Sequence, residues 1–174
     1  MSLLRAVIGG ISGIVATGPM TVAMVLMHRR LPLAERYPLP PREITMKVAG
    51  RLGVAHKMAP AERSAATLVA HFAYGAATGA LFGLGARQRG PAGSATAGTL
   101  FGIAVWTASY LGLLPGAGIL SAATEHPARR NALMIAAHVI WGATLGLLFE
   151  VFIGETKQAS APLSTSPAPH RDAR

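Results

Sequence analysis

The sequence predicts an all-α polytopic membrane protein, a four-helix transmembrane bundle built from two parallel helix–loop–helix repeats. Three observations predict this fold. Only 13% of the residues are charged although 51% are hydrophobic, whereas about a quarter of the residues in soluble domains are charged. Four apolar segments have membrane-spanning length. The 20 glycines suit helices that pack closely within a bilayer.

The apolar segments predict transmembrane helices near residues 6–27, 64–84, 92–114 and 133–153. About 20 apolar residues cross the hydrocarbon core as a helix. The first three segments contain no Asp, Glu, Lys or Arg, and the fourth contains only Glu150 near its end. Soluble helices carry a polar face, which these segments lack. We expect Glu150 to extend to the membrane interface rather than to line an ion pathway.

The first loop, residues 28–63, is strongly basic and contains eight of the 16 Lys and Arg residues. Basic residues beside apolar segments are typical of topology signals and of contacts with anionic lipid headgroups. We therefore expect the lipid bilayer, and not nucleic acid, to be the partner of these charges. Within the loop, residues 42–52 predict a short helix on which Ile44, Val48 and Leu52 share a face. This helix either lies at the membrane surface or packs on the ends of the bundle.

The distribution of charge also predicts an orientation. The first and third loops contain ten of the Lys and Arg residues, and the N-terminus, second loop and tail contain six. The positive-inside tendency places the two richer loops in the cytoplasm and both termini outside. Residues 155–174 are rich in Ala, Ser and Pro, so we expect a disordered tail after a transmembrane domain of residues 1–154.

An internal repeat relates two of the predicted helices. Residues 60–82 align with residues 127–149 without a gap, and eleven of these 23 positions are identical. The matches include Pro60 with Pro127 and His71 with His138, which apolar composition alone does not readily produce. We infer a duplication of a helix–loop–helix unit. Two crossings return the chain to its starting side, so the copies run parallel about an axis along the membrane normal.

The repeat places a histidine and two glycines on one face of each duplicated helix. His71 and His138 each begin a series at positions i, i+4 and i+8, which fall on one helical face. Glycines four residues apart mark close-packing faces in apolar helices. The predicted packing residues are Gly9, Gly13, Gly75, Gly79, Gly98, Gly102, Gly142 and Gly146. His71 and His138 therefore point toward protein and form a candidate intramembrane functional pair.

Two short segments resemble a known family. Pro38-Leu39-Pro40-Pro41-Arg42 follows the first predicted helix, and Ala137-His138-Val139-Ile140-Trp141 lies in the last. Both resemble segments of the YagU-like small bacterial inner-membrane proteins. The resemblance covers about a fifth of the chain. It implies a polytopic inner-membrane protein of unassigned biochemical activity, and it supplies no catalytic residues.

The residues predict a protein that is not an enzyme. The chain has no cysteine, which excludes thiolate nucleophiles and cysteine-ligated metals, and it contains no phosphate-binding loop, zinc-protease motif or serine elbow. We expect a multi-pass envelope or assembly component of the cell inner membrane, able to form a homo-oligomer, with no cofactor or metal. The alternatives are a small oligomeric transporter or channel, and an electron-transfer module with haem between His71 and His138. For the two histidines we favour structural hydrogen bonding to neighbouring helices over a proton or ligand role.

Overall fold

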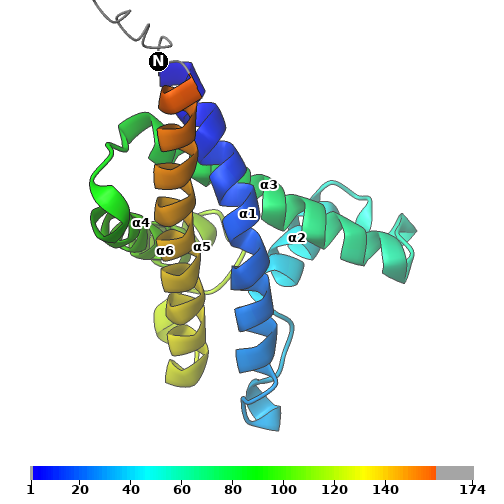
Figure 1. Ribbon diagram of the computed structural model, residues 1–174. Helices are drawn as coiled ribbons and strands as arrows, with labels where there is room; N and C mark the ends of the chain where they lie inside the picture. Colours follow the sequence, from blue (N-terminus) through cyan, green and yellow to red (C-terminus); the bar gives the residue numbers. More distant parts are fainter. Residues whose placement is uncertain (1, 160–174) are drawn as a thin grey trace, which may run out of the picture.

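The computed structural model describes residues 2–159, apart from the side chain of Lys157, and every regular element in this range is helical (Figure 1). Four helical segments are long and apolar enough to span a membrane: Ser2–His28, Pro60–Gly85, Gly90–Gly116 and Ala128–Thr156. By length and composition, the chain is a multi-pass membrane protein. This agrees with the all-helical class and the four crossings expected from the sequence.

Helices α1 (Ser2–His28) and α3 (Pro60–Gly85) form the first packed pair. They cross where glycines remove side chains from both backbones. A Cβ added at Gly9 would overlap the carbonyl oxygen of Gly79, and one added at Gly13 would overlap that of Gly75. Residues at this crossing approach as closely as backbones can, which maximises dispersion contacts where no hydrophobic effect drives helix association.

Helices α4 (Gly90–Thr107) and α6 (Ala128–Ala159) form the second pair in the same manner. A Cβ at Gly98 would overlap the carbonyl oxygen of Gly142, and one at Gly102 would overlap that of His138. Gly146 lies equally close to the backbone of Ser94. All eight glycines singled out in the sequence therefore lie at one of two helix crossings.

The two pairs are joined by α1 and α6, which run antiparallel beside each other (Figure 1). The indole Nε1 of Trp141 donates a hydrogen bond of 3.2 Å to the carbonyl oxygen of Gly13 at this contact. Ala16, Leu145 and Phe149 are fully buried and belong to the core that the pairs share. In contrast, α3 and α4 meet at only a few residues, so the bundle is open on that side.

Short helices occupy the loops: η1 (Leu33–Glu35), α2 (Pro40–Arg51), η2 (Ala55–Lys57) and η4 (Ala123–Glu125). Pro40 and Pro41 begin α2, where a missing backbone N–H costs nothing. Ile44 packs on the core, whereas Val48 and Leu52 are exposed. The face predicted to carry all three is thus divided between the bundle and the surroundings.

Helices α1 and α3 begin four residues earlier than expected, at Ser2 and Pro60, and three further boundaries differ. The third span is not a single α-helix, because a π-helical segment, η3 (Ala108–Leu113), separates α4 from the short α5 (Leu114–Gly116). Helix α6 begins at Ala128, directly after Pro127, and not near residue 133. It also continues to Ala159, so residues 155–159 of the predicted tail are helical. The rest of that tail, residues 160–174, lies outside the described residues.

The extension of Glu150 to the membrane interface stays a prediction, but its carboxylate has a role that the sequence did not indicate. Its carboxylate accepts hydrogen bonds from the backbone N–H groups of Arg89 and Gly90, at 3.3 and 3.2 Å, and from the Ser94 hydroxyl at 2.6 Å. Helix α4 begins with no side-chain cap of its own, so its first N–H groups lack partners within the helix. A carboxylate from α6 supplies them and is favoured there by the helix dipole.

Candidate functional site

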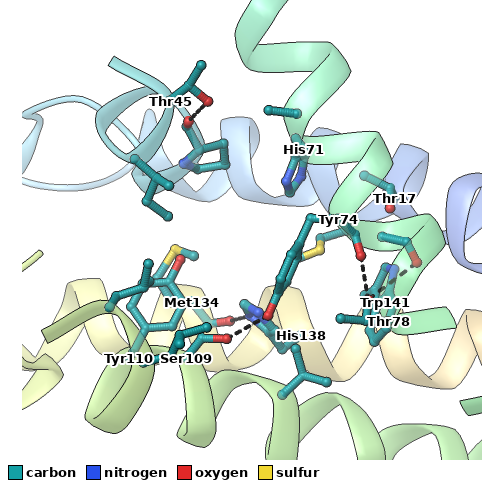
Figure 2. A pocket seen from close by; sticks show the side chains of 18 residues that line it. Thr17, Thr45, His71, Tyr74, Thr78, Ser109, Tyr110, Met134, His138 and Trp141 are labelled. Carbon is teal, nitrogen blue, oxygen red and sulfur yellow. Dashed lines mark hydrogen bonds between the residues drawn. The ribbon is translucent and has the colours of Figure 1, made fainter. Parts of the chain in front are cut away.

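A cavity of about 210 Å³ lies on the open side of the bundle, between α3 and η3 (Figure 2). Residues of α1, α2, α4, α5 and α6 complete its walls. The lining is mainly apolar, and no Asp, Glu, Lys or Arg contributes to it. His71 and His138, the candidate pair predicted from the repeat, both line this cavity.

His138 is 6% exposed and is held in one orientation. Its Nδ1 lies 2.8 Å from the carbonyl oxygen of Met134, one helical turn earlier on α6. A carbonyl oxygen only accepts, so Nδ1 carries the hydrogen. In the neutral ring, Nε2 then has a free lone pair. The ring of Tyr110 on η3 packs edge-on against this imidazole, with 6.0 Å between ring centroids.

His71 approaches the cavity from α3 (Figure 2). Its Nε2 atom is buried and makes no hydrogen bond within residues 2–159. The neighbouring Phe72 ring packs edge-on, with 6.2 Å between centroids. Most buried polar atoms in proteins have a hydrogen-bond partner. The unpaired Nε2 of His71 is therefore a site at which a ligand could gain a hydrogen bond.

Tyr74 crosses the cavity between the two histidines in Figure 2 and joins α3 to η3. Its hydroxyl lies 2.8 Å from the hydroxyl of Ser109. Ser109 lies within the π-helical segment, and insertions of this kind are frequent at functional sites. The Thr17 and Thr78 hydroxyls also line the cavity, but each donates to a backbone carbonyl of its own helix.

Sequence reasoning missed several cavity residues. Tyr74 and Trp141 occupy matched positions of the repeat, yet nothing in the pattern placed them in a cavity. Ser109 and Tyr110 carried no signal, because the π-helical turn that presents them has no recognisable motif. Among residues 2–159, no group of three or more His, Cys, Asp or Glu side chains is placed to hold a metal ion.

A second polar cluster lies at the opposite end of the bundle from the Glu150 cap. The Arg130 guanidinium donates to the carbonyl oxygens of Glu35, Tyr37 and Pro38, at 3.2, 3.0 and 2.6 Å. It also lies 3.4 Å from the centroid of the Tyr37 ring. The Tyr37 hydroxyl lies 2.8 Å from Nδ1 of His126. These contacts fasten the first loop to the start of α6.

Comparisons of the chain with protein-family models, with curated proteins and with solved structures found no match. The resemblance to YagU-like proteins therefore stays a prediction.

Proposed function

We propose that the chain is a non-enzymatic, multi-pass envelope or assembly component of the bacterial inner membrane, related to the YagU-like proteins. The observation that carries this proposal is the Arg130 clamp. An arginine that donates to three carbonyl oxygens and covers an aromatic ring holds the first loop in one conformation. A loop fixed in this way offers a preformed surface to a partner, at little entropic cost on binding.

The surface that the loop presents is both cationic and apolar. Its exposed cations are Arg29, Arg30, Arg36, Arg42, Lys47, Arg51 and Lys57. Beside them, Leu33 is 82% exposed and Leu52 is 71% exposed. Basic residues next to a membrane attract anionic headgroups, and exposed leucines gain from contact with the acyl boundary. This combination supports the contact with anionic lipid that the sequence predicts.

The orientation that we propose has this loop in the cytoplasm and both termini outside. Contacts of Arg130 with the first loop, and of Arg51 with the carbonyl oxygen of Gly118, are consistent with the first and third loops lying on one side. Because the chain contains no cysteine, a single cysteine can be introduced at Leu33 or after residue 159 as the one labelling site. We expect a membrane-impermeant maleimide to label the second site, and not Leu33, in intact spheroplasts. The opposite pattern would reverse the orientation.

The proposed duplication draws support from the helix crossings. In each pair, glycines of the second helix lie against backbone of the first, and the aligned positions Gly75 and Gly142 both occupy a crossing. The pairs do not meet symmetrically, since α1 packs on α6 while α3 and α4 diverge. If the copies are related by an axis along the membrane normal, that symmetry has been broken on the side of the cavity.

Lipid retention tests the role of the loop. Full-length protein would be purified from native membranes and its bound lipids identified by mass spectrometry. We expect anionic lipid to co-purify, and the double variant Arg42→Gln/Lys47→Gln to retain less of it. Arg87→Gln/Arg89→Gln, which removes two exposed charges from the second loop, is the matched control. Equal retention by all three proteins would contradict the proposed contact.

A photo-crosslinker at Leu33 tests assembly. We expect one discrete protein adduct in native membranes, either a second copy of the chain or another membrane protein, and its loss when Arg130 is replaced by Ala. Absence of any adduct would contradict the assembly role.

The cavity favours a second candidate, a small oligomeric transporter. Solute flux in proteoliposomes that a bulky substitution at Ser109 abolishes would replace the first proposal with the second.

A further inference from the structure

The cavity beside His71 and His138 has the features of a binding site for a ligand that arrives from the lipid. Its walls come from the four spanning segments and α2. Two of its residues, Tyr74 and Leu113, are 45% and 63% exposed, so the cavity opens to the outside of the bundle within those segments. A molecule that partitions into the bilayer could enter there without crossing water.

The lining excludes a charged ligand. No acidic or basic residue other than the two histidines contributes a wall, and an unpaired charge in such surroundings is very costly. Beside aliphatic residues, the walls include three large aromatic side chains and two methionines: Tyr74, Tyr110, Trp141, Met20 and Met134. Aromatic rings pack favourably on one another and on methionine sulfur. The walls therefore suit a neutral aromatic molecule.

The polar atoms of the cavity specify one further feature of that molecule. His138 donates through Nδ1 to Met134, so its Nε2 can accept a hydrogen bond. Nε2 of His71 is buried without a partner. Both rings lie at the cavity wall in Figure 2. A ligand hydroxyl would satisfy an acceptor that the protein leaves free, and a purely apolar ring would not.

The volume sets the size of the ligand. At about 210 Å³, the cavity exceeds the roughly 150 Å³ of an apolar cavity that takes up benzene. It falls below the roughly 300 Å³ at which pockets for drug-sized molecules begin. One substituted ring fits these limits.

We propose that the cavity binds a lipid-soluble phenol. Its hydroxyl donates a hydrogen bond to Nε2 of His138, and its aromatic ring packs on Tyr110 and Trp141. This site is independent of the proposed role of the first loop.

The test compares two ligands of nearly equal shape, 4-fluorophenol and 4-fluorotoluene, on the full-length protein in lipid nanodiscs. Binding is followed by fluorine NMR, with empty nanodiscs to subtract partitioning into lipid. A hydrogen bond contributes about 1 kcal/mol net, so we expect the phenol to bind at least about fivefold more tightly. Equal affinities, or no saturable binding of the phenol, would overturn the proposal.

The variant His138→Asn locates the hydrogen bond. The asparagine amide can still donate to the Met134 carbonyl oxygen, as Nδ1 does, but it places no acceptor where Nε2 lies. In His138→Asn we expect 4-fluorophenol and 4-fluorotoluene to bind with about equal affinity. His56→Asn changes an exposed histidine outside the cavity, and we expect this control to bind the phenol more tightly, as the unmodified protein does. A preference that survives in folded His138→Asn would also overturn the assignment. If that variant does not fold, the comparison of the two ligands on the unmodified protein decides the matter.

Discussion

Adjacent glycines on α1 allow the close crossing with α3 to be tested almost without confounding effects. A Cβ at Gly9 would overlap the carbonyl oxygen of Gly79 and lie 2.8 Å from the Cα of Gly83. A Cβ at Gly10 would lie 3.5 Å from its nearest neighbour, the carbonyl oxygen of Ala76. Gly9→Ala and Gly10→Ala therefore make the same chemical change in the same helix, and only the first overlaps backbone atoms of α3.

The magnitude follows from that geometry. Ordinary Cβ contacts begin near 3.4 Å, so Gly9→Ala must move α1 from α3 by about 0.6 Å or more. A gap of roughly 0.5–1 Å forfeits a quarter to a half of each dispersion contact. Overpacking costs about 1–3 kcal/mol, and the upper end applies because backbone atoms have no alternative rotamer. The gain in helix propensity, about 1 kcal/mol, is common to both variants and cancels in their difference.

We expect Gly9→Ala to lie about 3 kcal/mol below Gly10→Ala in stability. At roughly 2–4 °C per kcal/mol for a chain of this size, its Tm in detergent should be about 6–12 °C lower. Thermal unfolding followed by circular dichroism measures the difference. If the two variants unfold at the same temperature, the close approach of α1 and α3 is not a determinant of stability.

Three further changes address other parts of the molecule. Glu150→Gln should destabilise the protein by about 1–2 kcal/mol, because it weakens the charge-assisted cap of α4; Glu155→Gln, an exposed control, should have no effect on the Tm. Arg130→Lys removes the guanidinium that reaches three carbonyls, so limited trypsin digestion should cut the first loop faster, and an unchanged rate would contradict the clamp. Protein expressed with ample haem should show no Soret band; a stoichiometric band that is lost on replacement of either His71 or His138 by Ala would make electron transfer the leading function.

The fold class could be predicted because its signals are local and chemical. Apolar length alone marks a spanning helix, and glycines at a spacing of four identify which face has room for another backbone. Gly75 and Gly142 were found in this way, and the structure places both at helix crossings. The histidines could be placed on the protein-facing side by the same reasoning, because His71 and His138 lie one turn before those glycines.

The parts that sequence could not supply depend on contacts between distant segments. Glu150 has an ordinary position near a helix end, and only the fold brings it to the uncapped start of α4, 60 residues away. The π-helical turn at Ser109 has no pattern of its own, so the cavity wall that it forms was not foreseen. Arg130 entered the loop charge count and, matched with Arg63, the internal repeat, but neither indicates its three carbonyl partners, which are more than 90 residues away.

The distance along the chain between Arg130 and its partners has a consequence for biosynthesis. The clamp joins Arg130 to Glu35 across 95 residues. At about 5–20 residues per second, the ribosome needs about 5–20 s to deliver the arginine after the glutamate. During that interval α1 and α3 can already pair in the bilayer, because both precede α4. The Arg130 contacts with the loop, however, cannot form until the last helix emerges. The nascent protein thus passes through a stage in which membrane insertion is well advanced, but Arg130 does not yet hold the first loop.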